Sequence, residues 1–452
     1  MAECIAQLGL DFHEELAVVV GFDAPEISSD GGAVLLRQVD DRLGLSAWIS
    51  RLLPDGRNAL QVAHDRLEQV RQRLYQIALG YEDCNDAQSL RHDPVLKTAC
   101  ERTPEDEQGL SSQPTLSRFE NAVGMRTLKQ VMEGLEHSWV ERLPPGTTEV
   151  VLDIDTTDDE THGQQQLSFF HGYYDHHMYH PLLIFDGDGQ LVSAILRPGN
   201  VHAARGALSV LQRVIRTLKR RFPDVQVVVR GDAGFAVPRL LDGLEQLNAE
   251  LGGIDYLFGI AKNAVLLRLA APAMAESAAL YARTHGHVRE FTKVEYAAES
   301  WSRQRTVVVK AEHHHKGANP RFVVTTLGEF EARLLYDAYC ERGQCENLIK
   351  DLKNALKADR LSCSKFVVNA FRLLLHAAAY RLMHALRHAA QAVGSDLGRQ
   401  QFDTIRLRLL KVAALVAQST RRISIRLPRA FPLAGVFRAL ALHTAGVVPS
   451  TA

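Results

Sequence analysis

Four acidic residues have sequence surroundings that suit metal-dependent chemistry. In VVLDIDTTDD, Asp153 and Asp155 alternate with apolar residues, so both carboxylates would point to one face of a strand. Asp232, in VQVVVRGDAGF, follows a second apolar strand, at the kind of strand end where parallel sheets bind ligands. Glu346 lies on a helical segment further along. Any one of these acids could simply cap a turn or helix, but converging carboxylates can hold two Mg²⁺ or Mn²⁺ ions about 4 Å apart for in-line displacement at a phosphodiester.

The segment YDAYCERGQCENLIKDLKNALK, Tyr336 to Lys357, carries a polar stripe next to an apolar one. At about 100° per residue, the polar stripe comprises Tyr339, Arg342, Glu346, Lys350, Lys353 and Lys357, and the apolar stripe comprises Leu334, Ala338, Cys345, Ile349, Leu352 and Leu356. A solvent-facing helix with i,i+4 ion pairs would show the same polar stripe. Beside two strand-borne aspartates, the stripe instead predicts bases that contact DNA phosphates and a tyrosine that stacks on a base or hydrogen-bonds a phosphate.

The elements around these residues predict an α/β domain. Strand patterns in EVVLDIDTT, YHPLLIFDG and QLVSAILRP are followed by a helix near 204–221, the strand VQVVVRGD, a helix near 237–251 and the strand DYLFGIAKN. This order predicts a ribonuclease-H-like core, a mixed sheet with helices on its faces. RTVVVKAEHHHK and RFVVTTL predict a β-rich insertion at about 263–330, inside a catalytic domain spanning 146–385.

The two flanks differ from this core. Helical periodicity from about 33 to 143 predicts an all-helical N-terminal region, 1–145. Within it, QPTLSRFEN has a candidate N-cap in Thr115 or Ser117 and carries Arg118 near the start of a helix, which could enter a DNA groove or belong to a plain bundle. The predicted C-terminal region, 386–452, is basic, because residues 401–430 hold seven Lys or Arg side chains against Asp403 alone.

Composition limits the other possibilities. The 452 residues are 46% hydrophobic and 23% charged, as in soluble globular proteins. The start lacks a signal-peptide pattern, and FVVNAFRLLLHAAAYRLMHAL is interrupted by charged residues, so we expect a cytoplasmic protein without a membrane segment. The cysteines form no C-x-x-C pair, and the histidine-rich HGYYDHHMYH and EHHHKG lack zinc-site spacing. The sequence has no phosphate-binding G-x-x-x-x-G-K-[ST] loop, which removes any basis for ATP use.

These motifs together resemble the DDE transposases of bacterial insertion sequences, specifically insertion-sequence family 1380. Tyr339, Arg342, Glu346 and Lys353 fit the Y-x2-R-x3-E-x6-K signature of that superfamily. LDIDTTDDETHGQQQ with FFHGYYDHHMYHPLLIFDGDG, and then RGDAGF, resemble its two aspartate blocks, and YQIALGYEDCNDAQSLRHDPVLK and QPTLSRFEN resemble its N-terminal blocks. The resemblance therefore covers most of the chain.

The resemblance implies specific roles. Asp155, Asp232 and Glu346 would be the metal ligands and catalytic acids, with Asp153 a close rival to Asp155, and two Mg²⁺ (or Mn²⁺) ions would be the cofactors. The implied DNA contacts are Tyr339, Arg342, Lys350, Lys353, Lys357, Lys262 and Arg118. The implied partners are the terminal inverted repeats of the element, target DNA and a second copy of the chain in a synaptic complex, with the N-terminal region binding DNA or dimerising.

Two other functions remain open at this point. A ribonuclease-H-like nuclease would use the same acids to cut DNA without joining it to a target. A catalytically silent protein could bind the element's ends and repress it, although such a binder has no need of carboxylates near phosphates, which would repel them.

Overall fold

The chain folds into two compact units. The computed structural model describes residues 8–10, 12, 14, 16–21 and 24–446. The described residues up to Ala122 and from Leu382 onward form one unit, and residues 123–381 form the other. The described N- and C-terminal parts therefore belong to the same unit, and all the candidate acids belong to the other.

The first unit is mainly helical. Its N-terminal part contains β1 (Leu8–Leu10), β2 (Val18–Val20), β3 (Ile27–Ser28), α1 (Ala33–Leu43), α2 (Leu45–Leu52), α3 (Arg66–Leu79), α4 (Ala87–Leu90), α5 (Pro94–Ala99) and α6 (Gln113–Asn121). Its C-terminal part contains α14 (Phe402–Ile405), β16 (Ala414–Ser419), β17 (Arg422–Arg426) and α15 (Ala434–Thr444). β16 pairs with both β17 and β3, and α15 packs on α1. The two parts thus share one sheet and one helical core.

Two details of this unit differ from the sequence expectations or refine them. The N-cap of α6 is Ser112, so the prediction of Thr115 or Ser117 was wrong and both lie inside the helix. Of the basic C-terminal residues, Lys411 pairs with Asp30 at 2.7 Å. The bases on and beside the β16–β17 hairpin are exposed: Arg421, Arg422, Arg426 and Arg429. Only part of the positive charge is therefore available at the surface.

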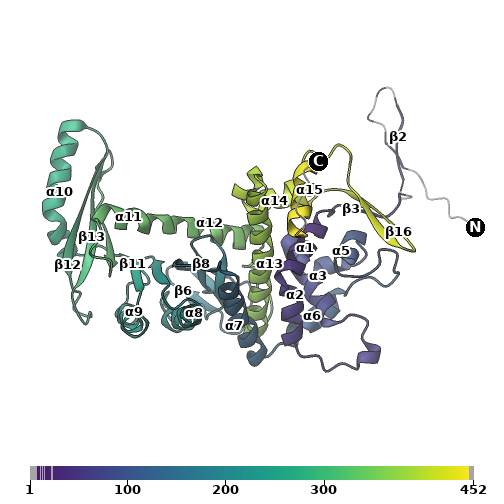
Figure 1. The fold of residues 1–452 in the computed structure, drawn as a ribbon, viewed down its shortest axis with the longest axis horizontal. Helices are drawn as coiled ribbons and strands as arrows, with labels where there is room; N and C mark the ends of the chain where they lie inside the picture. The colour runs from purple at the N-terminus through teal and green to yellow at the C-terminus, as the bar shows by residue number, and fades with distance from the viewer. Residues whose placement is uncertain (1–7, 11, 13, 15, 22–23, 447–452) are drawn as a thin grey trace, which may run out of the picture. The chain divides into compact units, whose positions relative to one another are not determined.

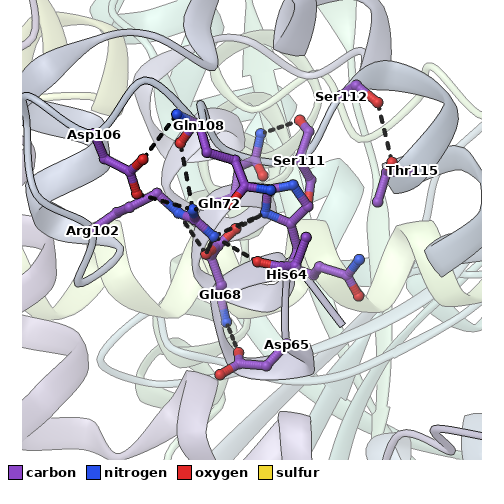
Figure 2. A network of polar contacts seen from close by, with 12 residues as sticks. His64, Asp65, Glu68, Gln72, Arg102, Asp106, Gln108, Ser111, Ser112 and Thr115 are labelled. Carbon is purple, nitrogen blue, oxygen red and sulfur yellow. Dashed lines mark hydrogen bonds and ion pairs between the residues drawn. The ribbon is translucent and has the colours of Figure 1, made fainter. Parts of the chain in front are cut away.

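A polar network holds the loop between α5 and α6 against α3 (Figure 2). Arg102 donates from Nη2 to Glu68 Oε2 at 2.6 Å. The other oxygen of that carboxylate contacts His64 Nδ1. Gln72, buried on α3, donates to the carbonyl of Ser111 at 2.9 Å. Side-chain bonds thus order a segment that has little regular structure of its own.

The second unit is built on a mixed nine-stranded sheet. Its elements begin with α7 (Met125–Arg142), β4 (Glu149–Thr156), β8 (Leu182–Asp186), β9 (Leu191–Ile195), α8 (Ala207–Arg221), β10 (Gln226–Gly231), α9 (Pro238–Leu251) and β11 (Ile254–Ile260). Four further strands complete the sheet: β12 (Val288–Tyr296), β13 (Arg305–His314), β14 (Gly317–Ala318) and β15 (Arg321–Thr325). The strand order is β12-β13-β15-β11-β10-β4-β8-β9, with β14 on β13. β4, β10 and β11 are parallel, whereas β8 and β9 run antiparallel. The predicted mixed α/β architecture is confirmed.

The segment after β11 extends this same sheet. It consists of α10 (Ala264–Thr284), β12 (Val288–Tyr296), β13 (Arg305–His314), β14 (Gly317–Ala318) and β15 (Arg321–Thr325). β15 pairs with β11, so the insertion forms one edge of the core sheet. The sequence patterns missed its first element, because α10 is alanine-rich and only three of its residues are buried, which leaves a weak amphipathic signal.

Among the described residues, one helix, α10, is long and apolar enough to cross a membrane by length and composition alone. It packs against β12 and β13. The segment FVVNAFRLLLHAAAYRLMHAL lies in α13 (Phe366–Ala392), and its Arg372, His376 and Arg381 are buried, as expected for a buried helix.

Strand alternation assigns each face of the sheet. Val150, Leu152 and Ile154 of β4 belong to the large core that includes α7, α8 and α9. Asp153 and Asp155 therefore point to the opposite face. That face carries α11 (Ala332–Cys340), whose Leu335 packs on Leu257, Val308 and Val323. Figure 1 shows α11 and α12 (Gln344–Lys350) on one side of the sheet and α8 and α9 on the other.

The helical segment after β15 is continuous but irregular. α11 leads through a 3₁₀ turn, η3 (Glu341–Gly343), into α12 (Gln344–Lys350) and a π-helical turn, η4 (Asp351–Ala355). Two stripe predictions are corrected by this geometry. Lys357 lies beyond η4 with φ +57°, so it has left the helical stripe. Leu334 is exposed and Leu335 is buried instead, because the buried stripe bends where the helix type changes.

Candidate active site

A cleft of about 450 Å³ lies on the α12 side of the sheet, beyond the ends of β4 and β10. Its lining consists of Asp155, Thr156, Thr157, Asp232, Arg342, Glu346, Ile349, Lys350, Lys353 and Asn354. The three acids predicted to act together thus line one cleft, although they come from three separate segments. The parallel pairing of β4 with β10, in which Ile154 lies opposite Gly231, places the two aspartates at neighbouring strand ends.

The side chain of Asp155 is largely buried. Its Oδ1 accepts a hydrogen bond from the Thr156 amide at 2.8 Å, and its Oδ2 lies 3.2 Å from Arg342 Nη1. Burial raises the pKa of Asp155 to about 6, and the negative charges of Asp232 and Glu346 raise it too. The Thr156 amide and Arg342 oppose this rise without cancelling it. Burial is therefore the main reason that the Asp155 carboxylate is costly to ionise in this cleft.

Asp232 and Glu346 are held less tightly. Asp232 follows β10 directly, and its Oδ1 accepts from the Gly234 amide at 2.9 Å, which fixes the turn after the strand. Glu346 lies in the first turn of α12 and is exposed. Its carboxylate is therefore free to change rotamer toward the two aspartates.

Asp153 is engaged elsewhere. Both of its oxygens bind Arg230, from Nε at 2.7 Å and from Nη2 at 2.8 Å, and both side chains are almost fully buried. Asp153 does not line the cleft. Arg230 Nη1 also donates to the Ala338 carbonyl at 2.7 Å and to Glu341 at 3.0 Å. One guanidinium therefore joins β4, β10 and the helix that leads to Glu346.

Three of the predicted basic residues line the cleft. Arg342 contacts Asp155, as described above, and Lys350 is exposed at the wall. Lys353 donates to the Asp158 carbonyl and to its carboxylate, the latter at 3.0 Å. These basic side chains line the same cleft as the acids. Such an arrangement suits an anionic substrate, whose phosphates could contact the basic side chains while metal ions bind the acids.

The other predicted contacts lie outside the cleft lining. The Tyr339 hydroxyl packs closely on Gly259 of β11, where a side chain would clash because an added Cβ would lie 2.5 Å from the hydroxyl oxygen. The Arg342 guanidinium lies 5.7 Å from the centre of the Tyr339 ring. The expected contact of Tyr339 with a DNA base or phosphate stays a prediction. Lys262, in the loop after β11, is exposed, and Lys357 is partly buried beyond η4. Arg118 is exposed on α6 of the first unit.

Sequence reasoning missed two functional neighbours. The first is Arg230, which lies two residues before Asp232. It pairs across the strands with Asp153, which lies two residues before Asp155. This matching position was the signal that could have identified it. Asp158 receives Lys353 and lies 3.4 Å from His176 Nε2. Asp158 belongs to a run of acidic residues after Asp155, and nothing in the sequence distinguished it from the other acids of that run.

The cleft suits a hard divalent cation. Three carboxylates supply the oxygen ligands that Mg²⁺ and Mn²⁺ prefer. Within the described part of the chain, no three His, Cys, Asp or Glu side chains already stand together as a metal-binding group.

The sequence matches the family model for transposase DDE domain group 1 over residues 11–446. The chain therefore belongs to this family, and it is a transposase of the polynucleotidyl transferase and nuclease class. Members of such families generally use divalent metal ions, in line with the donor set of the cleft.

Two solved transposase structures align with the chain. The cryo-EM structure of the piggyBac transposase synaptic complex with hairpin DNA aligns at 10% identity and a TM-score of 0.44, over 84% of this chain and 79% of that chain. The Mos1 transposase paired-end complex with left transposon end aligns at 16% identity and a TM-score of 0.17, over 36% of this chain and 54% of that chain. Scores this low carry no argument about fold or function. No curated protein matches the sequence.

The first prediction concerns the charge of Asp155. Its folded pKa of about 6 lies above the unfolded value of about 3.9. The folded state therefore binds a proton more tightly, and wild-type stability falls as pH rises from about 4 through 6. Asp155→Asn should unfold at higher urea than wild type at pH 7 without divalent metal, by up to about 3 kcal/mol, and should match it at pH 4. An equal difference at both pH values would contradict the raised pKa.

The second prediction concerns the Asp153–Arg230 pair. Arg230→Met leaves a buried carboxylate unpaired and should lower the free energy of unfolding by about 3–5 kcal/mol. Asp153→Leu combined with Arg230→Met should recover most of that loss in the same urea titration, because neither charge remains buried. DNA cleavage should stay impaired in the double variant, since the bond to Ala338 is also lost. Full activity in the double variant would show that the pair does not position the acids.

Proposed function

We propose that this transposase cleaves DNA at the terminal inverted repeats of an insertion sequence of the family 1380 type and joins the 3′ ends to target DNA. The observation that carries the proposal is the cleft itself, in which Asp155, Asp232 and Glu346 meet Arg342, Lys350 and Lys353. The proposed core is ribonuclease-H-like, in keeping with the observed order β4-β8-β9-α8-β10-α9-β11 and its antiparallel β8 and β9.

Asp155, Asp232 and Glu346 would hold two Mg²⁺ or Mn²⁺ ions. The bound ions would supply Lewis-acid activation of a water or 3′-hydroxyl and stabilise the leaving oxygen of the phosphodiester. The protein's own part is to fix two carboxylates at adjacent strand ends and bring the third on a helix. Arg342 would exchange Asp155 for a DNA phosphate once a cation neutralises the acid, because its Nη1 contact of 3.2 Å is long for a charge-assisted bond.

DNA binding would extend beyond the cleft. Lys350 and Lys353 would contact the backbone beside the cleaved phosphate, and Lys262 and Lys357 would contact it further away. Arg118 on α6 and the exposed arginines of the β16–β17 hairpin would serve end recognition by the first unit. Tyr339 would act by supporting Arg342, a role its packing on the sheet favours over stacking. Because an element has two ends, we propose that two copies of the chain pair them, acting on chromosomal DNA in the cytoplasm.

The third prediction tests the three acids. Glu346→Gln and Asp232→Asn should each lower cleavage of DNA carrying the element's ends by about a thousand-fold or more, because the lost metal contact removes several kcal/mol of transition-state stabilisation. End binding in a gel-shift assay should stay close to wild type. Asp337→Asn is the matched control, since Asp337 is an exposed acid of α11 that does not line the cleft. Metal-dependent cleavage retained by either cleft variant would remove that residue from the site.

The same reaction separates the alternative functions. With Mg²⁺, end-bearing DNA and a target plasmid, a transposase yields joined products. Cleaved ends without joined products would favour the nuclease alternative, and metal-independent binding without cleavage would favour the repressor. The three carboxylates in one cleft argue against the repressor, and the match to the transposase family model favours joined products over cleavage alone.

A further inference from the structure

Lys353, one of the bases that line the cleft, is held by a residue outside the cleft lining. It lies in the π-helical turn η4, and such turns are frequent at functional sites. Its ammonium group donates to the main-chain carbonyl of Asp158 and, at 3.0 Å, to Asp158 Oδ1. Asp158 lies between β4 and β5 (Asp159–Glu160) and does not line the cleft. Two bonds to one residue therefore tie the head of Lys353 to the cleft wall.

The Asp158 carboxylate is itself fixed in place. Its Oδ2, the oxygen that Lys353 does not use, lies 3.4 Å from Nε2 of His176 on β7 (His176–Tyr179). Burial acts to raise the pKa of Asp158, but the hydrogen bond and the charge of Lys353 outweigh it and hold that pKa below its usual value. Burial raises the pKa of the adjacent Asp159 well above its usual value, which favours the neutral form. Asp158 is therefore the charged partner of Lys353 in this run of acids.

The three acids of the cleft would compete for the same ammonium group. They line the cleft together with Lys353, in a volume of about 450 Å³. A lysine carries its charge on a flexible four-carbon stem, so its head can reach several positions from one backbone site. Arg342, another base of the lining, already contacts Asp155 at 3.2 Å. An ammonium group released from Asp158 would be attracted to these carboxylates in the same way.

We propose that Asp158 is a positioning residue that keeps the Lys353 ammonium group off Asp155, Asp232 and Glu346. The proposal rests on the proposed function, since it concerns the same cleft and its cations. Held at the wall, Lys353 leaves the oxygens of the three acids open to divalent cations and stays in reach of a DNA phosphate. Without the Asp158 carboxylate, Lys353 would pair with the acids, and a divalent cation would have to displace it.

The fourth prediction concerns Mn²⁺ binding in the absence of DNA, measured from the EPR signal of free Mn²⁺. Asp158→Asn should weaken this binding by about ten-fold, a loss typical of removing a group that orients a metal site. Asp158→Ser also removes the carboxylate and should give the same loss. Asp359→Asn is the matched control and should bind Mn²⁺ as wild type does, because Asp359 is a nearby acid in the turn after η4 that does not line the cleft. Binding that Asp232→Asn removes is assigned to the cleft.

A second substitution separates positioning from a simple loss of negative charge. In Lys353→Met no ammonium group can reach the acids, so adding Asp158→Asn should leave the Mn²⁺ affinity at the Lys353→Met value. A loss of Mn²⁺ affinity that is equally large with and without Lys353 would show that the Asp158 charge acts directly, and would overturn the proposal. Unchanged Mn²⁺ binding by Asp158→Asn would overturn it too.

Cleavage gives an independent readout. Asp158→Asn should cut DNA carrying the element's end slowly at low Mg²⁺ and should approach the wild-type rate as Mg²⁺ is raised, because the metal then displaces Lys353. Equally slow cleavage at every Mg²⁺ concentration would contradict the positioning role while leaving the proposed function standing. Wild type that neither binds Mn²⁺ in the cleft nor cuts end DNA would overturn the proposed function, and the role of Asp158 with it.

Discussion

The geometry of the cleft depends on one buried guanidinium. Arg230 binds both oxygens of Asp153 and donates to the Ala338 carbonyl, so it fastens β4 and β10 to α11. Asp153 lies two residues before Asp155, and Arg230 lies two residues before Asp232. The helix it anchors continues into α12, where Glu346 is found. A buried ion pair adds little net stability, but it fixes how the paired segments align, because a misplaced partner would leave a charge buried without its counter-charge.

The second constraint is the charge of the cleft. Asp155 is buried beside two other carboxylates, and the bases around it do not hold its pKa down. Such an arrangement is costly for an empty protein and useful for one that receives a cation. Arg342 contacts Asp155 at 3.2 Å, and its guanidinium lies over the Tyr339 ring. A second base, Lys353, is held at the cleft wall by its contacts with Asp158, and an anionic ligand would compete with Asp158 for the Lys353 ammonium group.

Periodicity and motif spacing predicted what depends on local pattern. Alternation in β4 placed Asp153 and Asp155 on one face, and the core strands and helices follow the expected order. Features that depend on tertiary contacts could not be predicted from the sequence. Asp153 and Asp155 have nearly the same local sequence, and only the partner on β10 separates the buried pair from the cleft acid. The helical stripe assumed a constant 100° per residue, and its polar side chains from Arg342 to Lys353 do share one cleft. It failed beyond η4, where Lys357 has left the helix. The joining of the two chain ends in one unit also lies beyond any local pattern.

The central claim is that Asp155, Asp232 and Glu346 jointly hold divalent cations. Anomalous scattering from Mn²⁺ in crystals of the protein bound to end DNA tests it most directly. The account predicts Mn²⁺ in the cleft with oxygen ligands from all three residues, Arg342 moved from Asp155 to a phosphate, and Asp153 still bound to Arg230. An absence of Mn²⁺ from the cleft, or Mn²⁺ ligated by Asp153 in place of Asp155, would contradict it.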